Sequence, residues 1–276
     1  RPAPRRPFSA LPTGPRHRLS ACPSSADVAR KRLDTAVTER GLAPSRARAQ
    51  SLIIAGKVRV GGEVVTKAGH GVEPDAEITV DQPEHPWVSR GALKLVAALD
   101  AFAIDPAGRD CLDVGASTGG FTDLMLDRGA RRVIALDVGH HQLDWKLRSD
   151  DRVVVMEGVN ARNLGPDELP FPVSLATFDL SFISLRLVVP AILPHLERGA
   201  DLVCLIKPQF EAGREQVGKG GIVRDDAVRR ATIDGVVGDL VALGLEHRGT
   251  VPSPITGQKG NREELAAFRW RAAPQE

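Results

Sequence analysis

The chain has 276 residues, 42% of them hydrophobic and 26% charged, with a formal net charge of +2. This size and composition predict a soluble protein with one large hydrophobic core and a smaller module. The longest apolar stretches are only as long as strands, so we expect neither a membrane span nor a membrane partner. The cysteines, Cys22, Cys111 and Cys204, form no C-x-x-C pair, which argues against disulfides and zinc and favours a reducing cytoplasm.

Positive charge is concentrated towards the start of the sequence. Residues 1–60 contain 13 Lys and Arg against 3 Asp and Glu, a net charge of +10, whereas the remainder contains 24 against 32, a net charge of −8. A basic segment can bind nucleic acid by neutralising phosphates and releasing counterions. We therefore expect a nucleic-acid contact here, with a solvated basic face as the alternative.

Residues 1–26 carry six prolines, five arginines and no acidic residue. Without apolar periodicity such a stretch cannot bury enough surface to offset its ordering entropy, so we expect it to be disordered. Its composition resembles an organellar transit segment, and an upstream extension or a fragment end explains it equally well.

Residues 27–80 predict a small α+β domain. Apolar residues recur at helical spacing from residue 28 to the stop at Gly41, and Ser45 is placed to cap a second helix that ends before Gly56. The expected buried residues of this second helix are Ala47, Leu52, Ile53 and Ile54. Strands are expected at 58–60, 64–65 and 78–80, with a turn at Gly61-Gly62.

Three segments of this domain resemble the αL RNA-binding domain shared by a small-subunit ribosomal protein and pseudouridine synthases. They are Arg32-Leu33-Asp34, Gly41-Leu42-Ala43-Pro44-Ser45-Arg46 and Ile54-Ala55-Gly56-Lys57-Val58-Arg59-Val60. Gly61 departs from the Asn usual in that family, which leaves the turn type open. A basic edge would position RNA by its shape and phosphates. The residues that we assign to RNA binding are Arg30, Lys31, Arg32, Arg46, Arg48, Lys57, Arg59 and, beyond this domain, Arg90.

Residues 81–88 are expected to form a linker, because Pro83 and Pro86 forbid a continuous helix. Trp87, near its end, has three possible roles: stacking on a base, locking the domains together, or covering the next helix.

Residues 89–276 alternate between helical and strand patterns. Helices are expected at 89–101, 120–128 and 225–243, and strands at 111–114, 133–137, 153–156, 174–179 and 201–206, followed by two short strands at the end. In the first helix we expect Leu93, Val96, Ala97 and Leu99 to face inward. This alternation predicts an α/β fold with a doubly wound, mostly parallel, Rossmann-like sheet.

The segment Asp113-Val114-Gly115-Ala116-Ser117-Thr118-Gly119-Gly120-Phe121 lies between an expected strand and helix. It lacks the G-x-G-x-x-G spacing of a dinucleotide fingerprint. It does contain the G-x-S-x-G of a serine-hydrolase elbow, with Asp179 and His195 or His247 following in hydrolase order. An elbow, however, needs several preceding strands, and only one helix of this domain comes before the motif.

The same segment suits a loop that binds S-adenosylmethionine, because its glycines let the backbone approach a ligand closely. Asp137, at the end of the next strand, can accept both ribose hydroxyls, and Asn160 would face the adenine. The residues assigned to cofactor binding are Asp113, Gly115, Ala116, Ser117, Thr118, Gly119, Gly120, Asp137, Asn160 and Asp179.

Lys207 and Asp179 each end an expected strand at the carboxyl edge of the sheet, where ligands bind in such folds. Buried charges there are costly unless they are functional or paired. Further segments, Ser89-Arg90-Gly91-Ala92-Leu93-Lys94, Phe178-Asp179-Leu180-Ser181-Phe182, Ile206-Lys207-Pro208-Gln209-Phe210-Glu211 and Gly260-Asn261-Arg262-Glu263, complete a pattern. Over residues 28–272 the chain resembles the TlyA branch of the FtsJ-type 2′-O-methyltransferases, which join an αL domain to this catalytic fold.

That resemblance implies a seven-stranded methyltransferase sheet, S-adenosylmethionine as cofactor, and the 2′-hydroxyl of cytidine in ribosomal RNA as acceptor. It also implies a catalytic tetrad of Lys94, Asp179, Lys207 and Glu263, with the adjacent Glu264 as the alternative to the last residue. The linker lacks the Arg-Ala expected before Trp87, and the haemolysin label of family members has no physical explanation in the sequence.

Methyl transfer to a ribose hydroxyl requires alignment and help with deprotonation, and we expect no metal. We expect Lys207 to accept the proton or to stabilise the oxyanion. Lys94 and desolvation would lower its pKa, whereas Asp179 and Glu263 would raise it. The competing hypotheses are a serine hydrolase that uses Ser117 and a non-catalytic RNA-binding or membrane-active protein.

Overall fold

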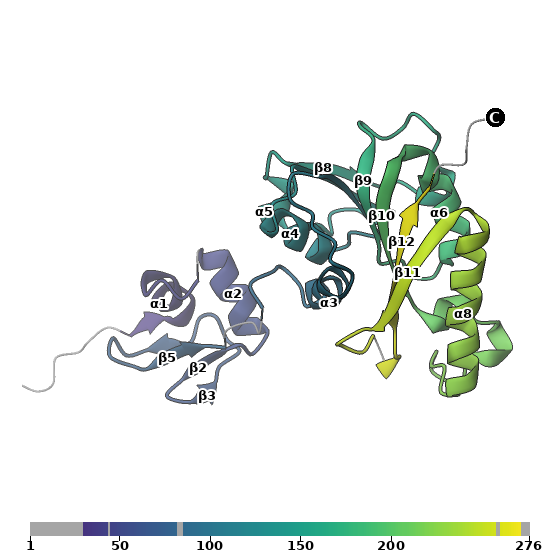
Figure 1. Ribbon diagram of the computed structural model, residues 1–276. Helices are drawn as coiled ribbons and strands as arrows, with labels where there is room; N and C mark the ends of the chain where they lie inside the picture. Colours follow the sequence, from purple (N-terminus) through teal and green to yellow (C-terminus); the bar gives the residue numbers. More distant parts are fainter. Residues whose placement is uncertain (1–29, 44, 82–84, 258–259, 272–276) are drawn as a thin grey trace, which may run out of the picture. The chain divides into compact units, whose positions relative to one another are not determined.

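The computed structural model describes residues 30–43, 45–81, 85–257 and 260–271. The chain divides into two compact units, residues 1–83 and 84–276 (Figure 1). The stretch expected to be disordered, residues 1–26, lies outside the described residues, as does part of the expected linker. Among the described residues, no helix combines the length and apolar character needed to cross a membrane.

The first unit packs two helices against a small antiparallel sheet. Its helices are α1 (Leu33–Glu39) and α2 (Arg46–Ile54), and its three-stranded sheet has the order β3 (Glu63–Val64), β2 (Val58–Val60), β5 (Ile78–Val80). A separate pair is formed by β1 (Lys31–Arg32) and β4 (Gly71–Val72). The core consists of apolar residues from both helices and the strands, chiefly Leu33, Ala36, Val37, Ala49, Ile53, Val58, Val72 and Ile78.

The first helix begins later than the apolar spacing predicted. Lys31 and Arg32 pair as a strand with Val72 and Gly71, so helical structure begins only at Leu33. Residues 27–29 of the prediction lie outside the described residues. The sequence signal missed here was the partner strand, which lies 40 residues away and leaves no local pattern.

The second helix begins where it was predicted. Ser45 is its N-cap, and its Oγ accepts a hydrogen bond from the Arg48 backbone N–H at 3.2 Å. The predicted buried stripe was wrong in part, since Ile54 is 70% exposed and Ala47 is also exposed. The helix turns Ala49 and Ile53 to the core instead, four residues apart as helical geometry requires.

The second unit is built on a seven-stranded sheet with the order β11-β12-β10-β9-β6-β7-β8. The five strands β10, β9, β6, β7 and β8 run parallel, and β12 is antiparallel to both β10 and β11. The strands are β6 (Asp110–Val114), β7 (Arg132–Asp137), β8 (Val153–Glu157), β9 (Val173–Phe178), β10 (Leu196–Ile206), β11 (Leu245–Pro252) and β12 (Glu264–Trp270).

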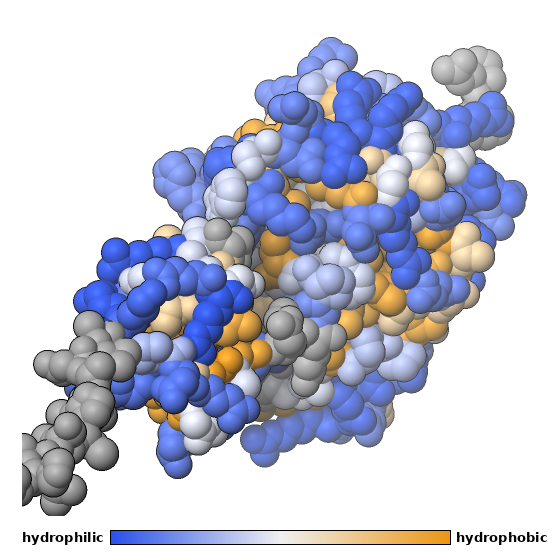
Figure 2. All heavy atoms as spheres, turned by 90° about the vertical axis from the view of Figure 1, so that its left-hand side faces the viewer, coloured by the Kyte–Doolittle hydropathy of each residue, from blue (hydrophilic) through white to orange (hydrophobic). Residues whose placement is uncertain are grey.

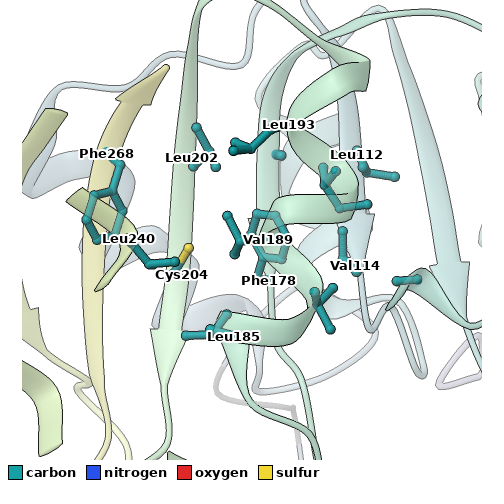
Figure 3. Packing of buried hydrophobic residues seen from close by; sticks show 14 of the residues in the cluster. Leu112, Val114, Phe178, Leu185, Val189, Leu193, Leu202, Cys204, Leu240 and Phe268 are labelled. Atoms are coloured by element: carbon teal, nitrogen blue, oxygen red, sulfur yellow. The ribbon is translucent and has the colours of Figure 1, made fainter. Parts of the chain in front are cut away.

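Helices cover both faces of this sheet (Figure 1). One face packs against α3 (Ala92–Phe102), α4 (Gly120–Asp127) and α5 (Trp145–Arg148), and the other against α6 (Leu185–Ile192) and α8 (Asp226–Ala242). Successive residues of β6 alternate between the two layers, Cys111 on the α3 side and Leu112 on the α6 side. Figure 3 shows the second layer, where Leu185 and Val189 of α6 lie among Phe178, Leu202 and Cys204. The prediction of a doubly wound, mostly parallel α/β fold is confirmed.

Short helical turns complete the unit: η1 (Ala161–Asn163), η2 (Leu193–His195), α7 (Pro208–Glu211) and η3 (Arg214–Gln216). The last two strands, β11 and β12, are longer than the short strands predicted, and β10 starts at Leu196, five residues early, with an irregularity before Asp201.

The inward face of α3 was predicted incorrectly. The helix begins at Ala92, and its fully buried side includes Leu95, Ala98 and Leu99, whereas Leu93, Val96 and Ala97 are only half-buried. The face also contains Lys94, which is buried because it has a buried acidic partner. An apolar pattern cannot count a lysine as an inward residue, and the predicted face was therefore rotated.

Candidate active site

The glycine-containing loop leaves β6 at the carboxyl edge of the sheet. Gly115 has φ +87°, and a Cβ at this position would lie 2.6 Å from the backbone oxygen of Asp179. Only glycine therefore allows the loop to pass so close to the end of β9. The loop then enters α4 at Gly120, so backbone N–H groups at its turn face the same edge as the ends of the parallel strands.

Asp137 closes this loop from the end of β7. Its Oδ2 accepts a hydrogen bond from the Ser117 N–H at 2.8 Å, and its Oδ1 accepts one from the Gly139 N–H at 2.7 Å. A carboxylate has about four lone-pair sites, so each oxygen retains capacity for a ligand hydroxyl.

A cavity of about 400 Å³ lies beside Asp137, in the range of ~300–1,000 Å³ typical of small-ligand sites. Asp137, Asn160 and Asp179 contribute its polar groups, and its apolar wall includes Leu136, Val138, Val159, Ala161, Ile183 and Val188. The Oδ1 of Asn160 accepts from the Arg162 N–H, which leaves its amide NH₂ for a ligand. Two hydroxyl acceptors beside an apolar slot suit an adenosine group, so the residues present fit S-adenosylmethionine.

Asp113 is placed differently from the other predicted cofactor residues. It is 1% exposed, and its carboxylate accepts from the N–H and Oγ1 of Thr122 and from Oγ1 of Thr177. Burial raises the pKa of Asp113 to about 7, against the opposing effect of the Thr122 hydrogen bonds. It borders only a small cavity of about 110 Å³ and mainly fastens α4 and β9 to β6 beneath the loop.

A second cavity, of about 260 Å³, adjoins the first and shares Gly115, Ser117, Asp179, Ser181 and Phe182 with it. All four predicted tetrad residues line this second cavity. Lys207 Nζ lies 2.6 Å from Asp179 Oδ1 and 3.1 Å from Ser181 Oγ. Lys94 Nζ lies 2.6 Å from Glu263 Oε2. The structure thus brings the four residues together as two ion pairs around one cavity.

Of the two adjacent glutamates, Glu263 is the one that enters this cavity. Glu264 instead pairs with Arg229 at 2.5 Å and Arg230 at 3.4 Å, on the side of α8. Gly257 makes room for Glu263, since a Cβ there would overlap its carboxylate.

Two aromatic residues that the sequence had not singled out lie at the mouth of the cavities. Phe182 is 88% exposed, its φ is +65°, and its ring lies 4.9 Å from that of Phe210 between centroids. An exposed phenylalanine in the left-handed region is strained and persists only where its surroundings fix it. Gln209 also lines the second cavity: its Nε2 donates to Glu263 Oε1 at 3.3 Å. Backbone strain and exposure, which sequence does not reveal, are the signals for these residues.

The serine-hydrolase alternative is not supported by the surroundings of Ser117. Its φ of +48° does resemble a nucleophile elbow. Its hydroxyl, however, bonds Gln142 Oε1 at 3.3 Å, while the His247 ring bonds Thr250 and His195 is buried in η2. Within the described residues, no histidine is thus hydrogen-bonded to this serine.

Most basic residues assigned to RNA binding in the first unit are exposed but paired with acids. Arg32 and Arg46 both contact the buried Asp34, whose pKa is held well below its usual range chiefly by the hydrogen bond from Arg32. Arg30 pairs with Glu73, Lys31 with Glu39, and Arg59 with Asp81. Arg48 and Lys57 have no acidic partner among the described residues. Hydrophilic side chains make up most of the surface seen in Figure 2.

Arg90 belongs to the second unit and lines the cavity that holds the tetrad. Nearby, the Trp87 indole donates to Asp127 Oδ2 at 3.2 Å and packs with the core beside α4. Of the roles considered for Trp87, the structure thus shows the covering of a helix, although of α4 rather than of the helix that follows it.

Comparison with known proteins agrees with this geometry. Residues 87–270 match the model of the FtsJ-like methyltransferase family, and residues 31–78 match the S4 domain. The 16S/23S rRNA (cytidine-2′-O)-methyltransferase TlyA of Mycobacterium tuberculosis is 51% identical over 87% of this chain and 90% of its own length. Hemolysin A of Brachyspira hyodysenteriae is 44% identical over 86% of this chain and 99% of its own. A solved structure from Streptococcus thermophilus has a TM-score of 0.69 and 41% identity, covering 90% of this chain and 91% of that one.

The fold and the site therefore define an S-adenosylmethionine-dependent methyltransferase of the FtsJ-like class that carries an S4 RNA-binding domain. More specifically, the chain belongs to the TlyA family. The predictions of family, fold class, enzyme class and cofactor are confirmed.

Proposed function

We propose that this protein transfers a methyl group from S-adenosylmethionine to the ribose 2′-hydroxyl of cytidine in ribosomal RNA. The single observation that supports this most is the cavity with two lysine–carboxylate pairs, which directly adjoins the cavity suited to the cofactor. The printed activity of the M. tuberculosis relative supplies the acceptor, and the S4 domain supplies a means of holding RNA.

In this proposal the cofactor supplies an activated methyl group, and the chain supplies orientation and charge. Two of the three N–H donors of Lys207 face Asp179 and Ser181, which fixes the ammonium and leaves one donor for the ribose oxygen. We assign to Lys207 the stabilisation of that oxygen as it loses its proton. The ion pair with Asp179 keeps the lysine charged and correctly placed.

Lys94 and Glu263 are assigned the opposite wall of the acceptor cavity. Their 2.6 Å contact is almost fully buried, with Lys94 side-chain exposure of 10% and Glu263 of 2%. Buried charges strengthen each other's field because little water screens them. The exposed Phe182, beside Phe210 at the cavity mouth, offers a face on which the target base can stack.

The test is methyl transfer from labelled S-adenosylmethionine to ribosomal subunits that lack the modification. We expect label in 2′-O-methylcytidine with the wild type, a large loss with Lys207→Ala, and retention with Ser117→Ala, which keeps the backbone N–H that Asp137 binds. A folded protein that binds the cofactor but labels neither subunit would exclude ribosomal RNA. Loss of activity in Ser117→Ala, with Lys207→Ala unaffected, would restore the hydrolase hypothesis.

A further inference from the structure

Two chain segments form the floor of the acceptor cavity, and they are joined at three points. The first segment, residues 179–184, follows β9, and the second, residues 207–211, follows β10. Lys207 bonds Asp179 and Ser181 at the start of both segments. In the middle, Phe210 packs against Phe182. Only the contact at the far end involves residues outside the two cavities.

That far contact is made by Glu211, at the end of α7. Its Oε2 accepts from Ser184 Oγ at 2.6 Å, and its Oε1 accepts from the Leu185 N–H at 2.8 Å. Arg186 Nη1 lies 3.0 Å from the same carboxylate, whose side chain is 2% exposed. A carboxylate buried to this extent is costly unless it is fully bonded, and here three donors bond it.

The three donors are all at the start of α6, where the loop from Asp179 enters the helix. Ser184 is the N-cap of α6, and its Oγ also accepts from the Arg186 N–H. Glu211 therefore binds the capped end of the helix and stops the loop from moving along it. The strained backbone of Phe182 lies two residues earlier, between this anchor and Lys207.

We infer that Glu211 is a positioning residue for methyl transfer: it anchors the loop 179–184 so that Asp179 and Phe182 stay in register with Lys207. It borders neither the acceptor cavity nor the cofactor cavity and acts only through the loop. The inference rests on the proposed function for its effect on rate, but not for its effect on the loop. Misplacement of reacting groups by about 1 Å can reduce a rate on the order of 100-fold, so such an anchor matters.

The test compares Glu211→Ala and Glu211→Gln with a matched control, Asp239→Asn. Asp239 is the other carboxylate partner of Arg186, and it lies on the exposed side of the network. We expect kcat for methyl transfer to fall roughly 10- to 100-fold in Glu211→Ala with little change in cofactor Kd. Glu211→Gln, whose amide can still accept from Leu185, should lie between, and Asp239→Asn should match the wild type.

A second readout needs no activity: hydrogen exchange of the amides in residues 180–187, measured on the whole folded protein without RNA. We expect faster exchange in Glu211→Ala and unchanged exchange in Asp239→Asn. Unchanged exchange in Glu211→Ala would overturn the inference, whether or not the protein methylates RNA. So would a wild-type kcat in that variant, or a loss of rate in Asp239→Asn equal to that in Glu211→Ala. Faster exchange without methylation by the wild type would instead count against the proposed function alone.

Discussion

Lys94 Nζ and Glu263 Oε2 lie 2.6 Å apart although 169 residues separate them in the sequence. Lys94 comes from α3, before the first strand of the sheet, and Glu263 lies immediately before its last strand, β12. The pair therefore ties the beginning of the catalytic unit to its end at the cavity wall. A buried pair of this kind is destabilised strongly when one partner is removed, typically by ~3–5 kcal/mol.

Glu263→Gln is predicted to abolish most methyl transfer while the protein stays folded. The amide can still accept from Lys94, but it leaves the ammonium without a counter-charge and changes the field across the cavity. The measurement is kcat together with thermal unfolding.

The adjacent residue offers the control for that experiment. Glu264→Gln removes an equally buried carboxylate from Arg229 and should lower stability while leaving kcat near wild type, because Glu264 does not line the acceptor cavity. Equal kcat losses in both variants would show that the loss comes from destabilisation and not from the cavity.

Asp137→Ala is predicted to weaken S-adenosylmethionine binding by roughly 10- to 100-fold, since hydrogen bonds to a charged group contribute ~1.5–3 kcal/mol. The change also releases the Ser117 and Gly139 N–H groups, which hold the loop. Calorimetric titration with the cofactor measures the effect. Glu157→Ala is a useful comparison, because Glu157 fixes the neighbouring loop through the His141 and Gln142 N–H groups without lining the cofactor cavity. A smaller loss there than in Asp137→Ala would support direct ribose contact.

The architecture of the second unit was predictable because each strand is a short apolar run and each crossover helix has its own period. The edge residues Asp179 and Lys207 were predictable for a related reason: parallel strands end at the same edge, so residues that follow them meet. The 2.6 Å contact between the two confirms that meeting, although not their roles.

Other features depend on distant contacts and left no local trace. The strand at Lys31–Arg32 exists only because Gly71 and Val72 lie beside it. The buried side of α3 was wrong because Lys94 is stabilised inside by Glu263, far along the chain. Periodicity cannot detect such pairs, and the family resemblance alone joined Lys94 with Glu263.

Among the basic residues of the S4 domain, those without acidic partners should dominate RNA affinity. Arg48 and Lys57 have none among the described residues, so a phosphate need not displace a carboxylate to reach them. Each contact released should reduce the slope of log Kd against log salt by about 0.7–0.9. Arg48→Ala and Lys57→Ala are therefore predicted to lower the slope, as measured by RNA binding at several salt concentrations. The control is Arg30→Ala, since Arg30 pairs with Glu73; an equal decrease there would contradict the distinction.

Asp113 predicts an unusual dependence of stability on pH. Burial raises the pKa of Asp113 to about 7 in the folded chain, whereas a free aspartate titrates near ~4. Between these values the unfolded chain has released a proton that the folded chain retains, so the free energy of unfolding should fall as pH rises from ~4 towards 7. Asp113→Asn cannot ionise, yet its amide can accept from Thr122 and donate to Thr177. Its melting temperature relative to wild type should therefore rise between pH 5 and 8, on the order of the few kcal/mol that such a shift implies.

Asp110, on the same strand, provides a comparison of opposite sign. Hydrogen bonds from Arg131 and Arg132 lower the pKa of Asp110 to about 2, so its carboxylate stabilises the fold above pH ~4 and loses this effect as pH falls through 2. Asp110→Asn should thus destabilise the protein at pH 7, and the loss should shrink in acid. Two residues three positions apart on β6 would then shift stability in opposite directions at neutral pH, because one carboxylate faces two guanidinium groups and the other only hydroxyl and amide donors. Parallel pH profiles for the two variants would show that burial at Asp113 does not control its protonation.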